Sequence, residues 1–168
     1  YTFAGWTGTE LDAATITVKI AKGSIGERNY TATWTPNENT AYKVEHYKQT
    51  VTGGDEENST NYAIVTADTQ HLTGTTGASI TPEVKTYTGF TSPSAKTTTI
   101  EADGTTVIKY YYKRNSYTIT FNTDGGSTIA PITQDYGTTI EAPAAPTKTG
   151  YIFAGWDNYQ QKIEENWL

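Results

Sequence analysis

Few residues of this chain could carry catalysis. Its two histidines, His46 and His71, fall in separate strand-like segments, and the chain has no cysteine. No H-x-x-x-H pair, nucleophile elbow or phosphate-binding glycine loop accompanies them. The carboxylates that glycoside hydrolysis would need lie mostly in loops such as residues 55–57, a pattern typical of solvated turns. We therefore expect no enzyme, no catalytic residue and no cofactor, and we interpret the histidines as strand or rim residues.

Metal and covalent chemistry have equally little support. Residues 122–125 (NTDG) resemble part of a calcium loop, but the remaining oxygen ligands at fixed spacing are missing. A hairpin-type turn is the expected structure there, and no metal site is predicted. A lysine–asparagine isopeptide bond is an alternative for which the spacing singles out no pair.

Aromatic side chains are the remaining candidates for a functional site. The chain has four tryptophans and 13 tyrosines, which could form a sugar-stacking platform or a protein-binding patch. For the tryptophans we favour a core interpretation instead: Trp6 and Trp156 fill the small module core, and Trp34 ends a strand with its ring on that core. Strand alternation turns Tyr111 away from its two neighbours, so at least one ring of that run should be exposed. The candidate binding patch comprises Tyr87, Phe90, Tyr110, Tyr111 and Tyr112.

Composition excludes several partners. The formal net charge is −6, and no stretch concentrates lysine or arginine, so neither nucleic acid nor an anionic membrane surface is an expected partner. No apolar run is long enough to span a bilayer. The absence of cysteine excludes disulfides, and the absence of methionine as well suits an exposed, extracellular protein.

The elements that must position these residues are predicted to be strands. The 35 threonines and 13 tyrosines favour strands, and 15 glycines supply turns, so the fold class is mainly β with little helix. We expect a hairpin of 15–20 with 30–34, with Leu11, Ile16, Val18 and Ile20 in its core. Further strands are expected at 41–51 and 117–121, a second hairpin around the turn at 103–104, and a short helical turn over 82–86.

One phrase occurs twice. Residues 1–6 read YTFAGW and residues 151–156 read YIFAGW, 150 positions apart. A duplicated piece of core would explain the match. A window cut from a longer repetitive protein explains it better, and we expect the latter.

The terminal segments resemble a known repeat. Residues 117–156 carry N-T-D-G-G, then Y-G, then A-P-x-x-P-T-K-T-G-Y, then F-A-G-W, and in this order they resemble the Listeria–Bacteroides repeat, the internalin-B-type B-repeat. Residues 1–35 resemble the remaining part of the same repeat, and the tail after 156 departs from its pattern. The structural motif residues carried by the resemblance are Trp6, Trp34, Tyr117, Phe121, Gly125, Gly126, Tyr151, Phe153, Gly155 and Trp156.

The middle of the chain is similar to a mucin-binding-protein-like (MucBP-like) module. The residues concerned are YKVEHYKQ, LTGTTGASITPEVKTYTGF and EADGTTVIKYYYKRN. Both resemblances imply β-grasp, ubiquitin-like folds of the α+β type, with small mixed sheets in head-to-tail modules on bacterial cell surfaces. The implied organisation is a partial B-repeat at 1–35, a linker at 36–40, a MucBP-like module at 41–114 and a second partial B-repeat at 117–168.

These resemblances lead to an expected function. It is a non-catalytic stalk or spacer in a Gram-positive cell-wall or secreted adhesin. The alternative is a module that binds glycan, mucin or a host protein, and a more remote one is an accessory region of a carbohydrate-active enzyme. Because the terminal units are incomplete, each should expose an unpaired strand edge, and head-to-tail self-association between copies is expected.

Overall fold

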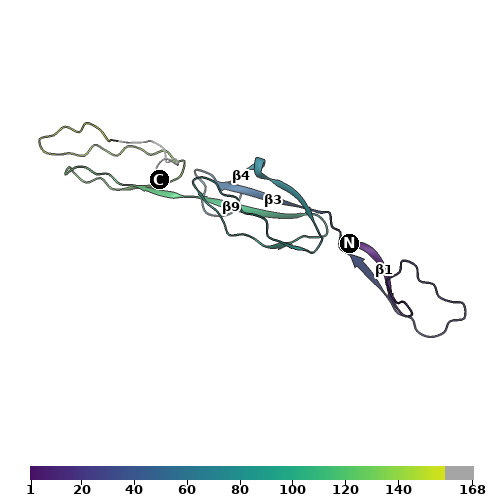
Figure 1. Cartoon of the computed structure of the whole chain (residues 1–168). Coiled ribbons are helices and arrows are strands. Elements are labelled where there is room, and N and C mark those ends of the chain that lie inside the picture. Colours follow the sequence, from purple (N-terminus) through teal and green to yellow (C-terminus); the bar gives the residue numbers. More distant parts are fainter. Residues whose placement is uncertain (158–168) are drawn as a thin grey trace. The chain divides into compact units, whose positions relative to one another are not determined.

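The computed structural model describes residues 1–157, and in this range the protein is built of short strands in several small sheets (Figure 1). The helical content of these residues is one 3₁₀ turn, η1 (Thr66–Asp68). The mainly β fold class predicted from threonine and tyrosine content is therefore confirmed. The helical turn expected over 82–86 is wrong, since these residues form no helix.

The N-terminal segment is a two-stranded antiparallel sheet. Strand β1 (Thr2–Gly8) pairs with β2 (Tyr30–Thr35), from Thr2 opposite Thr35 to Gly8 opposite Tyr30. The register shifts between Phe3 and Gly5, and Gly5 takes a φ of 128°. A Cβ at this glycine would lie 2.8 Å from the backbone of Thr15, so the bulge admits only glycine.

The hairpin predicted for 15–20 and 30–34 is wrong in its first strand. Residues 15–20 form no strand, apart from an isolated bridge between Thr15 and Trp6. Strand β1, which contains the phrase TFAGW, pairs with β2 instead. Residues 15–20 are then left without a strand partner, and a strand without a partner cannot satisfy its backbone hydrogen bonds. Ile16 and Ile20 are consequently 64% and 59% exposed rather than buried.

A five-stranded sheet forms the middle of the chain. Its order is β4 (Tyr62–Ile64), β3 (Thr40–Gln49), β9 (Thr106–Arg114) and β7 (Phe90–Thr91), and β5 (Gln70–Gly74) also pairs with β3. The long strand predicted at 41–51 is thus confirmed as β3. Strands β4 and β5 pair antiparallel with successive parts of it.

The second predicted hairpin is only partly formed. Residues 101–104 turn as expected, with the Gly104 amide donating to the Glu101 carbonyl. The flanking strands, however, choose other partners: β8 (Thr98–Thr99) pairs with β6 (Ser79–Ile80), and β9 lies beside β3. A D-G turn fixes the local reversal, whereas the pairing follows from which apolar faces must be buried.

The C-terminal segment begins with β10 (Ser116–Ile119), which pairs antiparallel with β11 (Ile132–Asp135). The predicted turn at Gly125 and Gly126 is present, where the Gly126 amide donates to the Thr123 carbonyl. Residues 151–156 form no strand.

The chain divides into two compact units, and strands β3 and β9 contribute residues to both. The first contains Tyr1–Val44, Thr69–Pro82 and Lys96–Ile108; the second contains Glu45–Asp68, Glu83–Ala95 and, among the described residues, 109–157. Each has its own buried side chains: Val44, Ile100 and Ile108 in the first, and His46, Tyr62, Tyr110, Tyr112 and Ile140 in the second. The module boundaries expected from the sequence remain a prediction.

Candidate binding surface

The tyrosine run of β9 is mainly core. Tyr110 and Tyr112 are completely buried and pack on the His46 ring, with ring centroids 5.7 Å apart in both pairs. Tyr111 points to the other face, as alternation predicts, where it is half-buried and stacks on Tyr47 at 5.0 Å. Tyr110 and Tyr112 therefore cannot belong to an exposed aromatic platform, which corrects the candidate patch.

Tyr87 and Phe90 lie close together under one cation. The Lys48 ammonium is 4.0 Å from the Tyr87 ring centroid and 5.3 Å from that of Phe90. The Arg114 guanidinium is 5.1 Å from Phe90, and the ring of Tyr136 lies at 5.9 Å. Both aromatic rings are half-buried and already hold cations, which are worth about 0.5–1 kcal/mol each at such sites.

A buried polar network extends from His46. Its Nδ1 lies 2.8 Å from the Tyr112 hydroxyl, which accepts the Lys85 backbone N–H at 3.0 Å. The Tyr112 hydroxyl and His46 Nδ1 share one hydrogen bond, whose direction follows the tautomer of the imidazole. Nε2 of the same ring is buried and has no hydrogen-bond partner among the described residues. Burial, then the charge of Lys85, lower the pKa of His46, and Asp68 opposes this.

The network reaches solvent at Asp68. Its carboxylate accepts from Lys85 Nζ at 2.5 Å and from the Tyr87 hydroxyl at 2.6 Å. These two bonds, the lysine first, hold the pKa of Asp68 below its usual value. Burial and then the bond to Asp68 raise the pKa of Tyr87. From the sequence, His46 was interpreted as a strand or rim residue. The one signal for its burial was that it shares a face of β3 with Tyr42 and Val44, at every second position.

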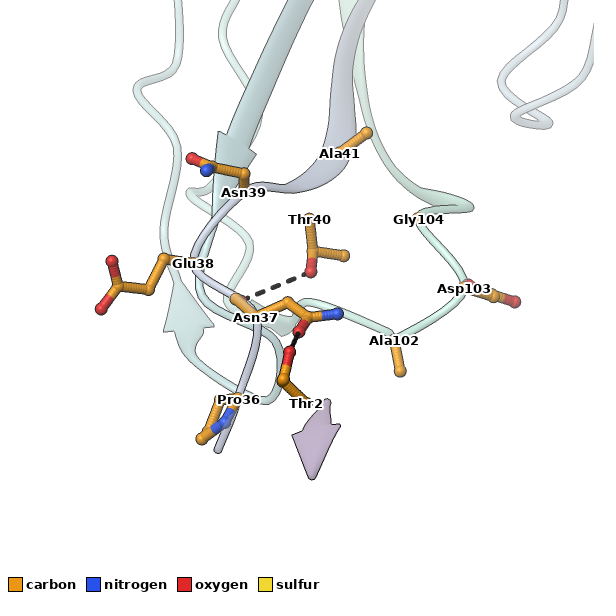
Figure 2. Close-up of a pocket in the computed structure, with 10 residues that line it drawn as sticks. All are labelled: Thr2, Pro36, Asn37, Glu38, Asn39, Thr40, Ala41, Ala102, Asp103 and Gly104. Atoms are coloured by element: carbon orange, nitrogen blue, oxygen red, sulfur yellow. Dashed lines mark hydrogen bonds between the residues drawn. The ribbon is translucent and has the colours of Figure 1, made fainter. Parts of the chain in front are cut away.

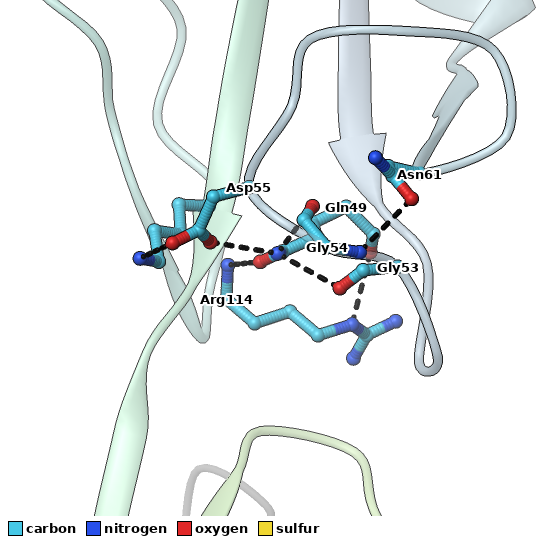
Figure 3. A network of polar contacts seen from close by, with 7 residues as sticks. Gln49, Gly53, Gly54, Asp55, Asn61 and Arg114 are labelled. Carbon is cyan, nitrogen blue, oxygen red and sulfur yellow. Dashed lines mark hydrogen bonds and ion pairs between the residues drawn. The ribbon is translucent and has the colours of Figure 1, made fainter.

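A second network joins the end of β3 to β9 (Figure 3). The Gln49 side chain is buried; its Oε1 accepts the Arg114 N–H at 2.9 Å, and its amide donates to Gly53 O, Gly54 O and Asp55 Oδ1. The guanidinium of Arg114 donates to the carbonyls of Gln49 and Tyr136. Every one of these bonds ties one loop or strand to another, so the network is structural.

An open polar hollow of about 690 Å³ lies in the first unit (Figure 2). Its lining residues are Thr2, Pro36, Asn37, Glu38, Asn39, Thr40, Ala41, Ala102, Asp103 and Gly104. Thr2 Oγ1 donates to Asn37 Oδ1 at 2.8 Å, and the backbone and hydroxyl of Thr105 both donate to Asp103. These bonds lower the pKa of Asp103. The side chains hold the turns in place, and they do not converge on a common point.

The tryptophans are less buried than the core interpretation required. Trp34 is 59% exposed and Trp6 is 37% exposed, so the expectation that they fill a small core is wrong for the described chain. Trp6 lines an apolar hollow of about 300 Å³ with Val18, Ile20 and Tyr30. Trp156 contacts Phe121 and Phe153, at centroid distances of 4.9 and 5.2 Å.

Residues suited to metal binding are not brought together. Within residues 1–157 there is no group of three His, Asp or Glu side chains that could hold an ion. The 122–125 segment is a turn in which Asn122 Oδ1 accepts the Asp124 N–H, and Lys148 Nζ lies 3.0 Å from Asp124 Oδ2. No helix among the described residues is long and apolar enough to cross a membrane.

The fold and these contacts define a class: a chain of small β units held by local polar networks. Residues 117–167 match the Listeria-Bacteroides repeat domain, a repeat typical of surface proteins such as internalins. This confirms the resemblance at the C-terminal segment. The resemblance of 1–35 and the MucBP-like character of 41–114 remain predictions.

Three relatives match parts of the chain. A protein of Evansella cellulosilytica named as a membrane protein is 37% identical over 73 residues, 43% of this chain and 10% of that protein. A Gly-rich membrane protein of the same organism is 36% identical over 62 residues, 36% of this chain and 7% of its own length. Internalin H of Listeria monocytogenes is 52% identical over 42 residues, 25% of this chain and 7% of its length.

The chain thus spans a tenth or less of the curated relatives it matches. No solved structure matches it. The β-grasp topology therefore remains an expectation.

Proposed function

We propose that this chain is a repeat region that acts as a spacer in a bacterial cell-surface or cell-wall protein, and that it has no catalytic role. The observation that carries the proposal is the recurrence of Y-x-F-A-G-W, 150 residues apart, with the second copy inside a match to a repeat of surface proteins. A repeating series of small β units adds length without adding a site.

The burial of the aromatic residues supports the same function. A binding platform needs rings that are free to meet a ligand, and the β9 tyrosines pack on His46 or on Tyr47 instead. The Tyr87 hydroxyl donates to Asp68, and the Lys48 ammonium lies over its ring. A module that sets a distance needs side chains that pack within their own unit, as these do.

Surface display tests the spacer role. The chain, in one, two and three copies, is placed between a wall anchor and an antibody epitope, and antibody access is measured by flow cytometry. We expect access to increase with copy number, and to exceed that given by flexible Gly/Ser linkers of equal residue number, because such linkers remain coiled. Equal access with every insert would refute the spacer function.

A binding module is the second candidate function. The Tyr87–Phe90 pair beneath Lys48 is the observation that favours it, since half-buried rings beside a cation could receive a glycan or an acidic peptide. Binding of the whole chain to mucin and to a glycan array tests this function. If the pair binds the ligand, Tyr87→Ala should weaken that binding. Trp34→Ala, an exposed aromatic position outside this pair, is the matched control.

A further inference from the structure

The two copies of the repeated phrase share one backbone and side-chain geometry. Gly5 has a φ of 128°, and Gly155, at the same place in the second copy, has a φ of 131°. The Phe3–Trp6 rings are 5.4 Å apart at 67°, and the Phe153–Trp156 rings are 5.2 Å apart at 65°. The second copy is therefore already shaped as the bulged strand that the first copy forms.

The first copy has a strand partner, whereas the second has none among residues 1–157. Strand β1 pairs with β2, Trp34 lies edge-on to Phe3 at 5.5 Å, and the backbone of Thr15 fills the space beside Gly5. Residues 151–156 form no strand, and nothing lies within 4 Å of a Cβ built at Gly155. Ile152 is 96% exposed.

The second copy in turn has a neighbour that the first lacks. Phe121 covers Trp156 at 4.9 Å, whereas Trp6 borders the apolar hollow that it shares with Val18, Ile20 and Tyr30. Among the described residues, the second copy thus lacks a strand like β2, and the first copy lacks an aromatic neighbour like Phe121.

We propose that residues 151–156 of one chain replace β1 against β2 of a second copy of this chain, so that copies associate head to tail. Five of the six residues are identical, so the strand pairs of residues 2–6 and the Phe–Trp pair of β1 are replaced by equivalent ones. The exchange also carries Phe121 toward the hollow beside β2, which buries apolar surface. The contact is heterologous, and each copy retains one donor and one acceptor.

The same substitution at the two equivalent glycines has opposite expected effects. Gly155→Ala removes the positive φ that the exchanged strand needs and places a methyl group against Thr15 of the acceptor, so association should weaken by at least about tenfold. Gly5→Ala disturbs only the resident strand and frees β2, so association should strengthen by a similar factor. Gly150→Ala, also at positive φ with open space around it, strains the backbone outside the exchanged strand, so it is the matched control and should leave association unchanged.

Sedimentation equilibrium across a concentration series of the whole chain measures these effects, and circular dichroism of each variant confirms that it is folded. A wild-type mass that rises with concentration, with the two glycine variants shifted in opposite directions, supports the proposal. A mass of one chain at all concentrations overturns it, as does association that Gly155→Ala leaves intact. None of these outcomes bears on antibody access in the display experiment, so the spacer function is tested separately.

A cross-link tests the register. In β1, Thr2 lies opposite Thr35, so Ile152 of one copy should lie opposite Thr35 of the next. The chain has no native cysteine, so Thr35→Cys with Ile152→Cys should give disulfide-linked oligomers on non-reducing gels. Thr31→Cys with Ile152→Cys, out of register by four residues, is the control. Cross-linked monomer alone would mean that the strand closes within one chain, and would overturn the exchange between copies.

Discussion

The hydroxyl of Tyr112 joins two other groups of the second unit. It accepts the Lys85 N–H and shares a hydrogen bond with His46 Nδ1, and the Tyr112 and His46 side chains have no access to water. A buried polar group without a partner costs more than the hydrogen bond itself contributes. Removing this one oxygen atom therefore affects two other groups.

Tyr112→Phe should lower the free energy of unfolding by about 1–3 kcal/mol, because it leaves His46 Nδ1 and the Lys85 amide unpaired in the core. Urea denaturation followed by fluorescence measures the change. Tyr42→Phe, at a half-buried tyrosine of β3 outside this network, should cost less and is the control. Equal losses in the two variants would contradict the role assigned to the hydroxyl.

The protonation of His46 should make stability depend on pH. Its folded pKa is lowered, so below the unfolded pKa of about 6.5 the unfolded chain binds a proton that the folded chain resists. Stability should then fall as the pH decreases from about 6.5 toward the folded pKa, by up to about 1.4 kcal/mol per pH unit. Lys85 works in the same direction and Asp68 against it.

Unfolding free energies at a series of pH values between neutral and mildly acidic test this prediction. His46→Gln should remove most of the slope, whatever it does to absolute stability, and His71→Gln at an exposed residue should retain it. A slope that survives His46→Gln would assign the pH dependence to the carboxylates instead.

At the scale of elements, the end of β3 depends on a single amide. Gln49 uses both its carbonyl and its NH₂ group, and its three acceptors are all oxygen atoms. Only a neutral amide can present an acceptor to Arg114 N–H and donors to these oxygens at the same position.

Gln49→Glu should destabilise the protein by at least about 2 kcal/mol, because a buried carboxylate would face the Gly53 and Gly54 carbonyls without a donor. Gln134→Glu is a well-matched control, since Gln134 uses its oxygen to accept from Thr138 Oγ1 and a carboxylate keeps that bond. Thermal unfolding of both variants gives the comparison. A loss for Gln134→Glu as large as for Gln49→Glu would count against this account.

The sequence predicted strand positions better than strand partners. Alternation identified β3 and β9, and glycine and aspartate identified the turns, because these signals are local. Alternation also predicted a strand at 15–20 that does not form. The partners of 15–20 and 98–99 depend on which edge is already occupied, and no local pattern carries that information. The candidate patch failed at Tyr110 and Tyr112 for a related reason: alternation says which rings share a face, whereas only the packed sheet says which face is buried.

At the scale of the whole molecule, each copy carries a formal charge of −6, so copies that meet head to tail repel one another. The proposed contact is made of backbone hydrogen bonds and apolar side chains, which salt screens little. Raising the ionic strength shortens the Debye length from about 30 Å at 0.01 M to about 8 Å at 0.15 M and weakens the repulsion. We therefore expect the wild-type chain to associate more strongly in the higher salt, as measured by sedimentation equilibrium at both salt concentrations.

Gly155→Ala should show no such gain, since it lacks the contact that the repulsion opposes. Weaker association at higher salt would mean that ion pairs hold the copies together, and the strand exchange would then be the wrong contact.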